Sequence, residues 1–203
     1  MSNPACKRTG VPAASFKRFG AGMYIKTQNG LADSDLGNLH DLLALMDGKL
    51  SSIVDAARRS ADPDSEGLFD EGDYFIGVAL TAIQQYITST YAQFKIDRSD
   101  ALRLPPKVNE NLTFVAALNA GSNFWKHRDE WGLRANVSRD IDSLNSQARQ
   151  TIKTIEILTP WDDYTLSNLL ACLTPSGELR LTELVPQLTE WRDAVDSMNR
   201  EVS

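Results

Sequence analysis

The apolar residues from position 33 onward recur at intervals of three or four, and this spacing constrains the fold more than any other feature of the sequence. A spacing near the helical period places such residues on one face of a helix. Asp33 or Ser34 precedes the first stripe and suits the N-cap of a helix. The first stripe consists of Leu36, Leu39, Leu43, Met46, Leu50, Ile53, Val54 and Ala57.

Similar stripes predict five further helices, over residues 74–96, 108–131, 138–158, 163–173 and from 182 onward. Ser138 is the expected cap of the third of these, and Pro186 falls in the first turn of the last, where proline is tolerated. Pro105-Pro106 predicts a loop over residues 98–107. Five or six helices with short loops and no series of strands predict an all-α fold, a single helical bundle with one continuous core.

Residues 1–32 differ from the rest of the chain. They hold five Lys and Arg residues, no acidic residue, and no helical period. We expect a basic, irregular and partly ordered N-terminal arm, with short extended segments at 16–19 and 23–25, followed by a helical bundle domain over 33–203. Phe16, Phe19 and Tyr24 lie among the basic residues, so nucleic acid contact is possible through this arm alone.

The charge of the remaining 171 residues is strongly negative, with 16 basic and 27 acidic side chains and a net charge of −11. Binding to phosphates requires clustered Lys and Arg, so this balance argues against nucleic acid on the helical body. It favours a basic protein partner instead. An acidic surface also keeps a protein soluble, and that simpler interpretation remains open.

Several features predict a cytoplasmic protein without a membrane segment or cofactor. No apolar run approaches the roughly 20 residues of a membrane helix. The first residues lack the apolar core of about 7–15 residues found in secretory signals. Cys6 and Cys172 lie far apart in the sequence and show no spacing typical of a metal site or a disulfide framework, which favours two reduced thiols. The general composition favours a bacterial source.

The segment from Asn123 to Trp131 holds one of the two histidines, next to a lysine, an arginine, two carboxylates and two tryptophans. Helical projection gathers Asn119, Asn123, Lys126 and Glu130 on the polar side, with His127 beside them. Asn123 lies four residues before His127, within reach of a hydrogen bond. Such a histidine could act as a general acid or base.

Arg128 projects onto the apolar face, which is unfavourable for an unpaired charge. Either the helix ends before Arg128, or its guanidinium meets a carboxylate from another helix. In composition the segment resembles the metal-independent helical ribonucleases of the HEPN type, which use an Arg and a His on a bundle helix. This resemblance implies a catalytic set of His127, Arg128, Lys126 and Asn123, although Asn123 stands a turn before His127 where an Arg would be expected. A helix end with aromatic anchors and paired charges, such as Lys126 with Glu130, explains the same residues.

The loop from Asp62 to Asp73 resembles the twelve-residue calcium loop of an EF-hand. Such loops carry oxygen ligands at alternate positions and a glycine at the sixth, here Gly67. The resemblance implies calcium ligands at Asp62, Asp64, Glu66, Asp70 and Asp73. An acidic connector that caps the second helix is the alternative.

The sequence contains no glycine-rich phosphate loop, no histidine pair at metal spacing and no GxSxG motif. We therefore expect a non-catalytic helical protein-binding module. Its acidic body would engage a basic protein partner, as an inhibitor or immunity protein engages a cationic toxin. A HEPN-like ribonuclease centred on His127 is the first alternative, and a weak calcium-binding module at 62–73 is the second.

Overall fold

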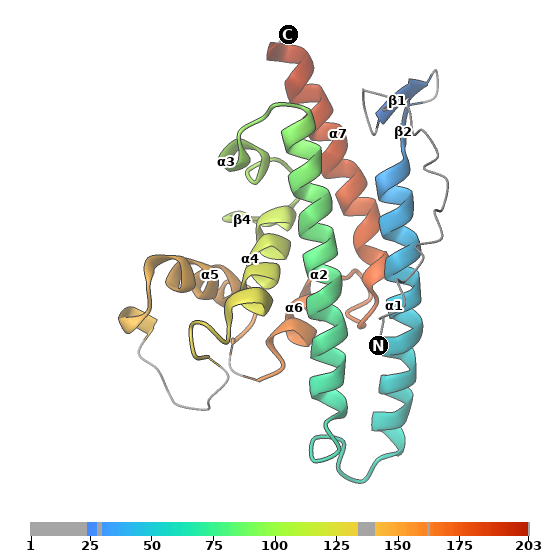
Figure 1. Ribbon diagram of the computed structural model, residues 1–203, viewed down its shortest axis with the longest axis vertical. Coiled ribbons are helices and arrows are strands. Elements are labelled where there is room, and N and C mark those ends of the chain that lie inside the picture. Colours follow the sequence, from blue (N-terminus) through green and yellow to red (C-terminus); the bar gives the residue numbers. More distant parts are fainter. Residues whose placement is uncertain (1–23, 28–29, 134–140, 162, 203) are drawn as a thin grey trace, which may run out of the picture.

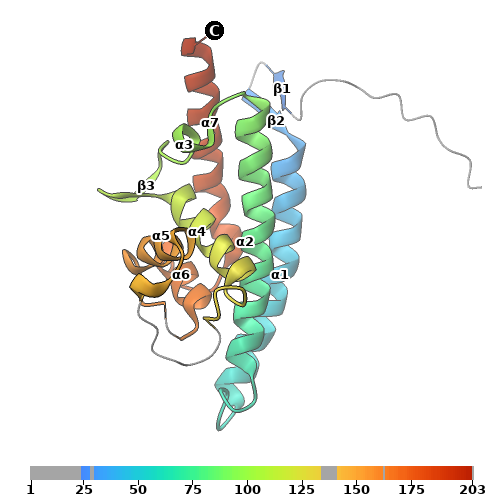
Figure 2. The same cartoon turned by 60° about the vertical axis from the view of Figure 1, so that its left-hand side comes forward.

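The protein is an all-α bundle organised around two long antiparallel helices (Figure 1). The computed structural model describes residues 24–27, 30–133, 141–161 and 163–202. Helices α1 (Ser34–Arg59) and α2 (Leu68–Gln93) form a hairpin along most of the height of the molecule. Helix α7 (Val185–Val202) runs beside the half of this hairpin that carries the start of α1, and α4 (Phe114–His127) packs against the other side of α2 (Figure 2).

The remaining elements are short. The helical ones are α3 (Arg98–Ala101), η1 (Ile141–Ser143), α5 (Ser146–Glu156), α6 (Thr165–Leu173) and η2 (Leu181–Leu184). The strands form two antiparallel pairs, β1 (Tyr24–Thr27) with β2 (Gly30–Asp33), and β3 (Lys107–Asn109) with β4 (Leu112–Thr113). The predicted all-α class is confirmed.

The predicted third helix, 108–131, is wrong at both ends. Residues 107–113 form the β3–β4 hairpin, whose turn is stabilised by a hydrogen bond from the Asn111 backbone N–H to Asn109 Oδ1 at 3.0 Å. The helix then begins at Phe114, where Thr113 Oγ1 accepts a hydrogen bond from the Ala116 N–H. It ends at His127, which confirms the first alternative given for Arg128, that the helix ends before this residue.

Two other helix starts also differ from the prediction. Helix α2 begins at Leu68 instead of residue 74, because Gly67 adopts φ 71°, a left-handed conformation that suits glycine and turns the chain directly into the helix. Helix α5 begins at Ser146 with Asn145 as its N-cap. The predicted cap Ser138 and the predicted extended segment 16–19 lie outside the described residues.

One continuous core joins the helices. Its largest fully buried side chain is Trp191 of α7, whose Nε1 donates a hydrogen bond to the Ala101 carbonyl at 2.9 Å. The crossing of α2 and α4 is close because Gly77 faces Trp125. An ideal Cβ at Gly77 would lie 2.1 Å from Trp125 Cδ2, so only glycine fits beneath this indole in its present position.

Carboxylates on α1 and α2 hold the later elements in place. Asp47 accepts hydrogen bonds from the backbone N–H of Leu181 at 2.6 Å and Thr182 at 3.1 Å, at the start of η2. Asp73 accepts hydrogen bonds from the Ser167 N–H at 2.8 Å and its hydroxyl at 2.7 Å, in the first turn of α6. Both carboxylates satisfy N–H groups that a helix start leaves without an intrahelical partner.

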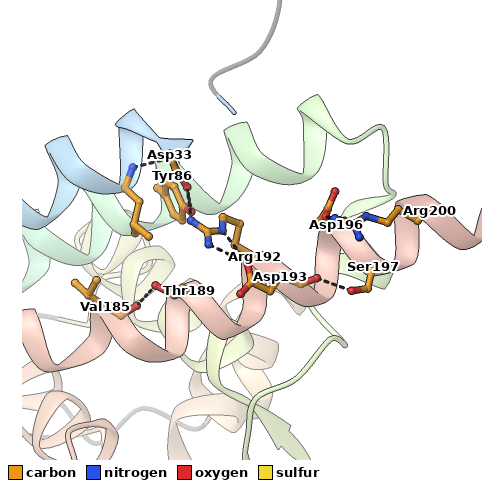
Figure 3. A network of polar contacts seen from close by, with 10 residues as sticks. Asp33, Tyr86, Val185, Thr189, Arg192, Asp193, Asp196, Ser197 and Arg200 are labelled. Atoms are coloured by element: carbon orange, nitrogen blue, oxygen red, sulfur yellow. Dashed lines mark hydrogen bonds and ion pairs between the residues drawn. The ribbon is translucent and has the colours of Figure 1, made fainter. Parts of the chain in front are cut away.

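A third carboxylate, Asp33, joins α1, α2 and α7 (Figure 3). Asp33 Oδ1 accepts a hydrogen bond from the Leu36 N–H at 2.9 Å, which caps α1. Its Oδ2 accepts from the Tyr86 hydroxyl at 2.7 Å and from Arg192 Nη1 at 3.3 Å. The side chains of Asp33 and Arg192 are only 2% and 8% exposed. Burial opposes the charge of Arg192, but the hydrogen bonds to Asp193 and Asp33 outweigh it and raise its pKa, so the cation is permanent.

We expect Arg192→Met to destabilise the protein by about 3–5 kcal/mol, because it leaves a buried carboxylate without its cation. Chemical denaturation monitored by circular dichroism measures this change. Arg103→Met is the matched control, since Arg103 is 80% exposed and pairs with Asp100 at 3.7 Å. Its loss should cost about 0–1 kcal/mol. Equal effects of the two substitutions would contradict the role given to Arg192.

Candidate functional site

His127 ends α4 in a half-buried position. Its Nδ1 lies 3.0 Å from Glu130 Oε2, and its ring stacks on Trp131 with a centroid distance of 5.5 Å and an interplanar angle of 28°. The predicted contact with Asn123 is replaced by the contact with Glu130. Glu130 is 71% exposed, so the imidazole belongs to a solvated helix end.

The other members of the predicted catalytic set turn away from His127. Lys126 donates a hydrogen bond to Gln84 Oε1 on α2. The guanidinium carbon of Arg128 lies 4.2 Å from the centroid of the Trp125 ring, a cation–π contact that covers the indole. The contacts described for the side chains of Lys126, His127 and Arg128 are thus with three different groups, and they do not converge on one substrate position.

Asn119, Asn123 and Lys126 share one polar side of α4 as predicted, whereas Glu130 lies beyond the helix. The residue that joins the three is one that the sequence did not single out. Gln84 of α2 donates through Nε2 to Asn119 Oδ1 at 2.8 Å and to Asn123 Oδ1 at 2.9 Å. Its Oε1 accepts from Lys126 and from the Ser122 hydroxyl, the latter at 3.1 Å. Arg98 also reaches Asn119 Oδ1, at 3.2 Å. No local pattern links Gln84 or Arg98 to α4, which explains why sequence inspection missed them.

Only the first half of the acidic segment 62–73 is a loop, because α2 begins at Leu68. Asp70 and Asp73 lie in the first turns of α2, and the Asp73 carboxylate is occupied by the start of α6. Asp62 Oδ1 accepts from the Ser65 N–H at 3.1 Å, and Asp64 accepts from the Tyr164 hydroxyl. Within the described part of the chain, no group of three or more His, Cys, Asp or Glu side chains is placed to hold a metal ion.

An apolar groove lies beside this acidic segment, between the end of α1, the start of α2 and α6. It has a volume of about 430 Å³, and its lining includes Ile53, Leu68, Phe69 and Leu179. Phe69 is 38% exposed and meets the Tyr164 ring edge-on at 5.0 Å. The stripe that predicted the first helix included Ile53, but no feature of the sequence indicated that part of this face would border an open groove.

Tyr164 lines the apolar groove and has a strained backbone conformation. Its φ of 48° is left-handed, which is uncommon and unfavourable for a residue other than glycine. The hydrogen bond from its hydroxyl to Asp64 ties the start of α6 to the loop between α1 and α2. This contact joins the acidic segment to the groove in one local structure.

Four carboxylates of the same segment, those of Asp62, Asp64, Glu66 and Asp70, pair with no Lys or Arg among the residues that the structure describes. Glu71, by contrast, lies 3.8 Å from Lys49. Hydrogen bonds from the Ser65 hydroxyl and backbone lower the pKa of Asp62, which keeps it ionised. The loop at this end of the bundle therefore carries uncompensated negative charge next to an apolar surface.

No protein-family model matches the chain, and comparisons with curated proteins and with solved structures give no match either. None of the described helices combines the length and the apolar character that crossing a membrane requires.

We expect Trp125→Ala to destabilise the protein by about 3 kcal/mol, because the indole fills the space against Gly77 and beneath Arg128. His127→Ala should cost about 1 kcal/mol or less, since it removes an exposed pair. Thermal denaturation of the two variants compares these effects. The same preparations should not cleave RNA without metal. Cleavage by the wild type that His127→Ala abolishes without loss of helicity would establish the ribonuclease alternative.

A second pair of substitutions separates calcium binding from helix capping. Asp73→Ala should cost about 1–3 kcal/mol, because it leaves the Ser167 donors in the first turn of α6 without an acceptor. Asp70→Ala, one turn earlier on α2, should be close to the wild type. Millimolar calcium should leave the melting temperature of all three proteins unchanged, since a ligand of the native state would raise it. A calcium-dependent rise that both substitutions remove would favour the EF-hand hypothesis.

Proposed function

We propose that this protein is a non-catalytic protein-binding module that engages a basic partner through its acidic loop and the adjoining apolar groove. The observation that supports this most directly is the position of four unpaired carboxylates beside the groove that contains Phe69. The fitting occupant is a partner segment with one large apolar side chain flanked by Lys or Arg. The apolar group would enter the groove, and the cations would face Glu66 and Asp70.

The surroundings of the groove support a protein segment more than a compact ligand. A second, more polar groove of about 670 Å³ adjoins it and shares Val54, Arg58 and Leu179 with it. The two arginines that line the more polar groove are already paired, Arg58 with Asp55 at 3.5 Å and Arg180 with Glu178 at 3.7 Å. The two grooves together offer an extended surface on which the unpaired charge is negative.

The apolar groove and the carboxylates beside it would contribute to binding in different ways. Burial of an apolar side chain in the groove would supply affinity, at roughly 25 cal/mol per Å² of apolar area removed from water. The carboxylates would mainly accelerate encounter and select basic partners. A role as an inhibitor or immunity-like protein in the cytoplasm agrees with this division, because such proteins must capture cationic targets quickly. Cys172 is an exposed free thiol, which agrees with a reducing compartment.

The proposal predicts that a labelled synthetic peptide with one Phe between Lys and Arg residues binds the full chain, with an association rate that falls steeply as salt rises. Stopped-flow fluorescence measures this rate. Glu66→Gln combined with Asp70→Asn should lower the association rate and its salt dependence. Phe69→Ser should instead speed dissociation. Glu190→Gln, on α7 outside both grooves, is the control for loss of a carboxylate elsewhere on the surface.

A peptide with Ser in place of Phe should bind the wild type more weakly than the Phe peptide does. The Phe69→Ser protein should bind the two peptides equally. A rate that is indifferent to salt, or binding that none of the groove variants changes, would overturn the proposal. A pull-down from native lysate with mass spectrometry then names the partner, provided that the groove variants lose it and Glu190→Gln does not. Size measurement of the purified chain checks whether a second copy occupies the groove instead, which would also count against a separate partner.

A further inference from the structure

A third groove, separate from the two at the acidic end of the bundle, lies between α3, α4 and α5. Its volume is about 550 Å³, and its polar lining consists of Arg98, Asn119, Asn123, Gln147, Gln150 and two threonines, Thr151 and Thr154. Arg98 supplies the positive charge of this lining, and no Asp or Glu belongs to it. This composition distinguishes it from the apolar groove at the acidic end of the bundle.

Two cations next to this groove lack counter-ions. Arg98 and Lys126 form no ion pair with a carboxylate in the part of the chain that the structure describes; their described hydrogen bonds are to amide oxygens of Asn119 and Gln84. Burial and then the charge of Arg98 lower the pKa of Lys126, which shows that the two cations repel each other. Two cations held together without an anion create a local positive potential.

The hydrogen-bond network also determines which way the amides point. A lysine ammonium only donates, so Gln84 must turn Oε1 toward Lys126 and Nε2 toward the two asparagines. Asn119 and Asn123 must then accept through Oδ1, as the structure has them. Their Nδ2 groups are left as free donors among the described residues, and both side chains line the groove.

The hydroxyl of a largely buried threonine adds to this set. Thr151 of α5 is only 5% exposed and lines the groove. Its hydroxyl has no hydrogen-bond partner within the described ranges. The hydroxyl is therefore available to a molecule bound in the groove.

We propose that the groove between α3, α4 and α5 binds a small ligand through an oxyanion group, either a phosphate or a carboxylate. Arg98 would pair with the anion, and the free Nδ2 groups of Asn119 and Asn123 would donate to its oxygens. Hydrogen bonds that involve an ionised group are roughly twice as strong as neutral ones, and a guanidinium matches the geometry of both oxyanions. The part of the ligand beyond the anion would lie against Gln147, Gln150 and Thr151.

The test is a titration of the full chain with inorganic phosphate and, in parallel, with citrate, at low ionic strength. Nuclear magnetic resonance of the side-chain amides of Asn119 and Asn123 reports on binding. We expect saturable shifts of both signals at millimolar concentrations, and the probe that binds more tightly identifies the class of oxyanion. Arg98→Gln should weaken binding at least about tenfold. Arg103→Gln, a neighbouring exposed arginine outside this groove, should leave it unchanged.

Asn123→Asp gives an independent check that does not risk the fold. An aspartate keeps an oxygen for Gln84 Nε2 but replaces the free donor by a second acceptor and adds a negative charge near Lys126. This variant should lose binding of both probes and melt no lower than the wild type, because the new charge compensates the two cations. Shifts that are absent or linear in concentration, or binding that survives both Arg98→Gln and Asn123→Asp, would overturn the proposal.

Discussion

The buried carboxylate of Asp33 is the interaction on which the arrangement of the long helices depends. One side chain caps α1, accepts a hydroxyl from α2 and pairs with a guanidinium from α7. Apolar contacts alone would let these helices slide or rotate, because dispersion and burial are non-directional. A buried anion must be matched by donors at fixed places. Asp47 and Asp73 apply the same constraint to η2 and α6.

The architecture could be predicted because periodicity reports directly on burial. The structure places α1, α6 and α7 within three residues of the predicted starts, and α1 buries five residues of its predicted stripe, Leu36, Leu39, Leu43, Leu50 and Ile53. The failure at 107–113 has a local cause. Val108 and Leu112 are four residues apart, which also suits a helix, while the decisive contact is the side-chain turn at Asn109. Short hairpins of this kind leave too few residues for a period of two to be recognised.

The candidate sites were less accessible to sequence analysis, because their partners are remote. Helical projection correctly gathered Asn119, Asn123 and Lys126, which share one helix. It could not supply Gln84, which lies 42 residues before Lys126. The acidic residues at 62–73 resembled both metal ligands and helix caps, and the residue that contacts Asp73, Ser167, lies 94 residues further along the chain. A sequence shows which groups are present, whereas the packing of the helices decides which of them are already satisfied.

The close approach of Gly77 to Trp125 has a consequence for how this fold can diverge. The indole of Trp125 occupies the space between α2 and α4 that a side chain at position 77 would otherwise fill. Neither position can change alone without a clash or a void, as close-packed interiors tolerate neither. In any set of homologous sequences the two positions should therefore co-vary, small against large. A pair with two bulky residues would mark a homologue in which the angle between these helices has changed.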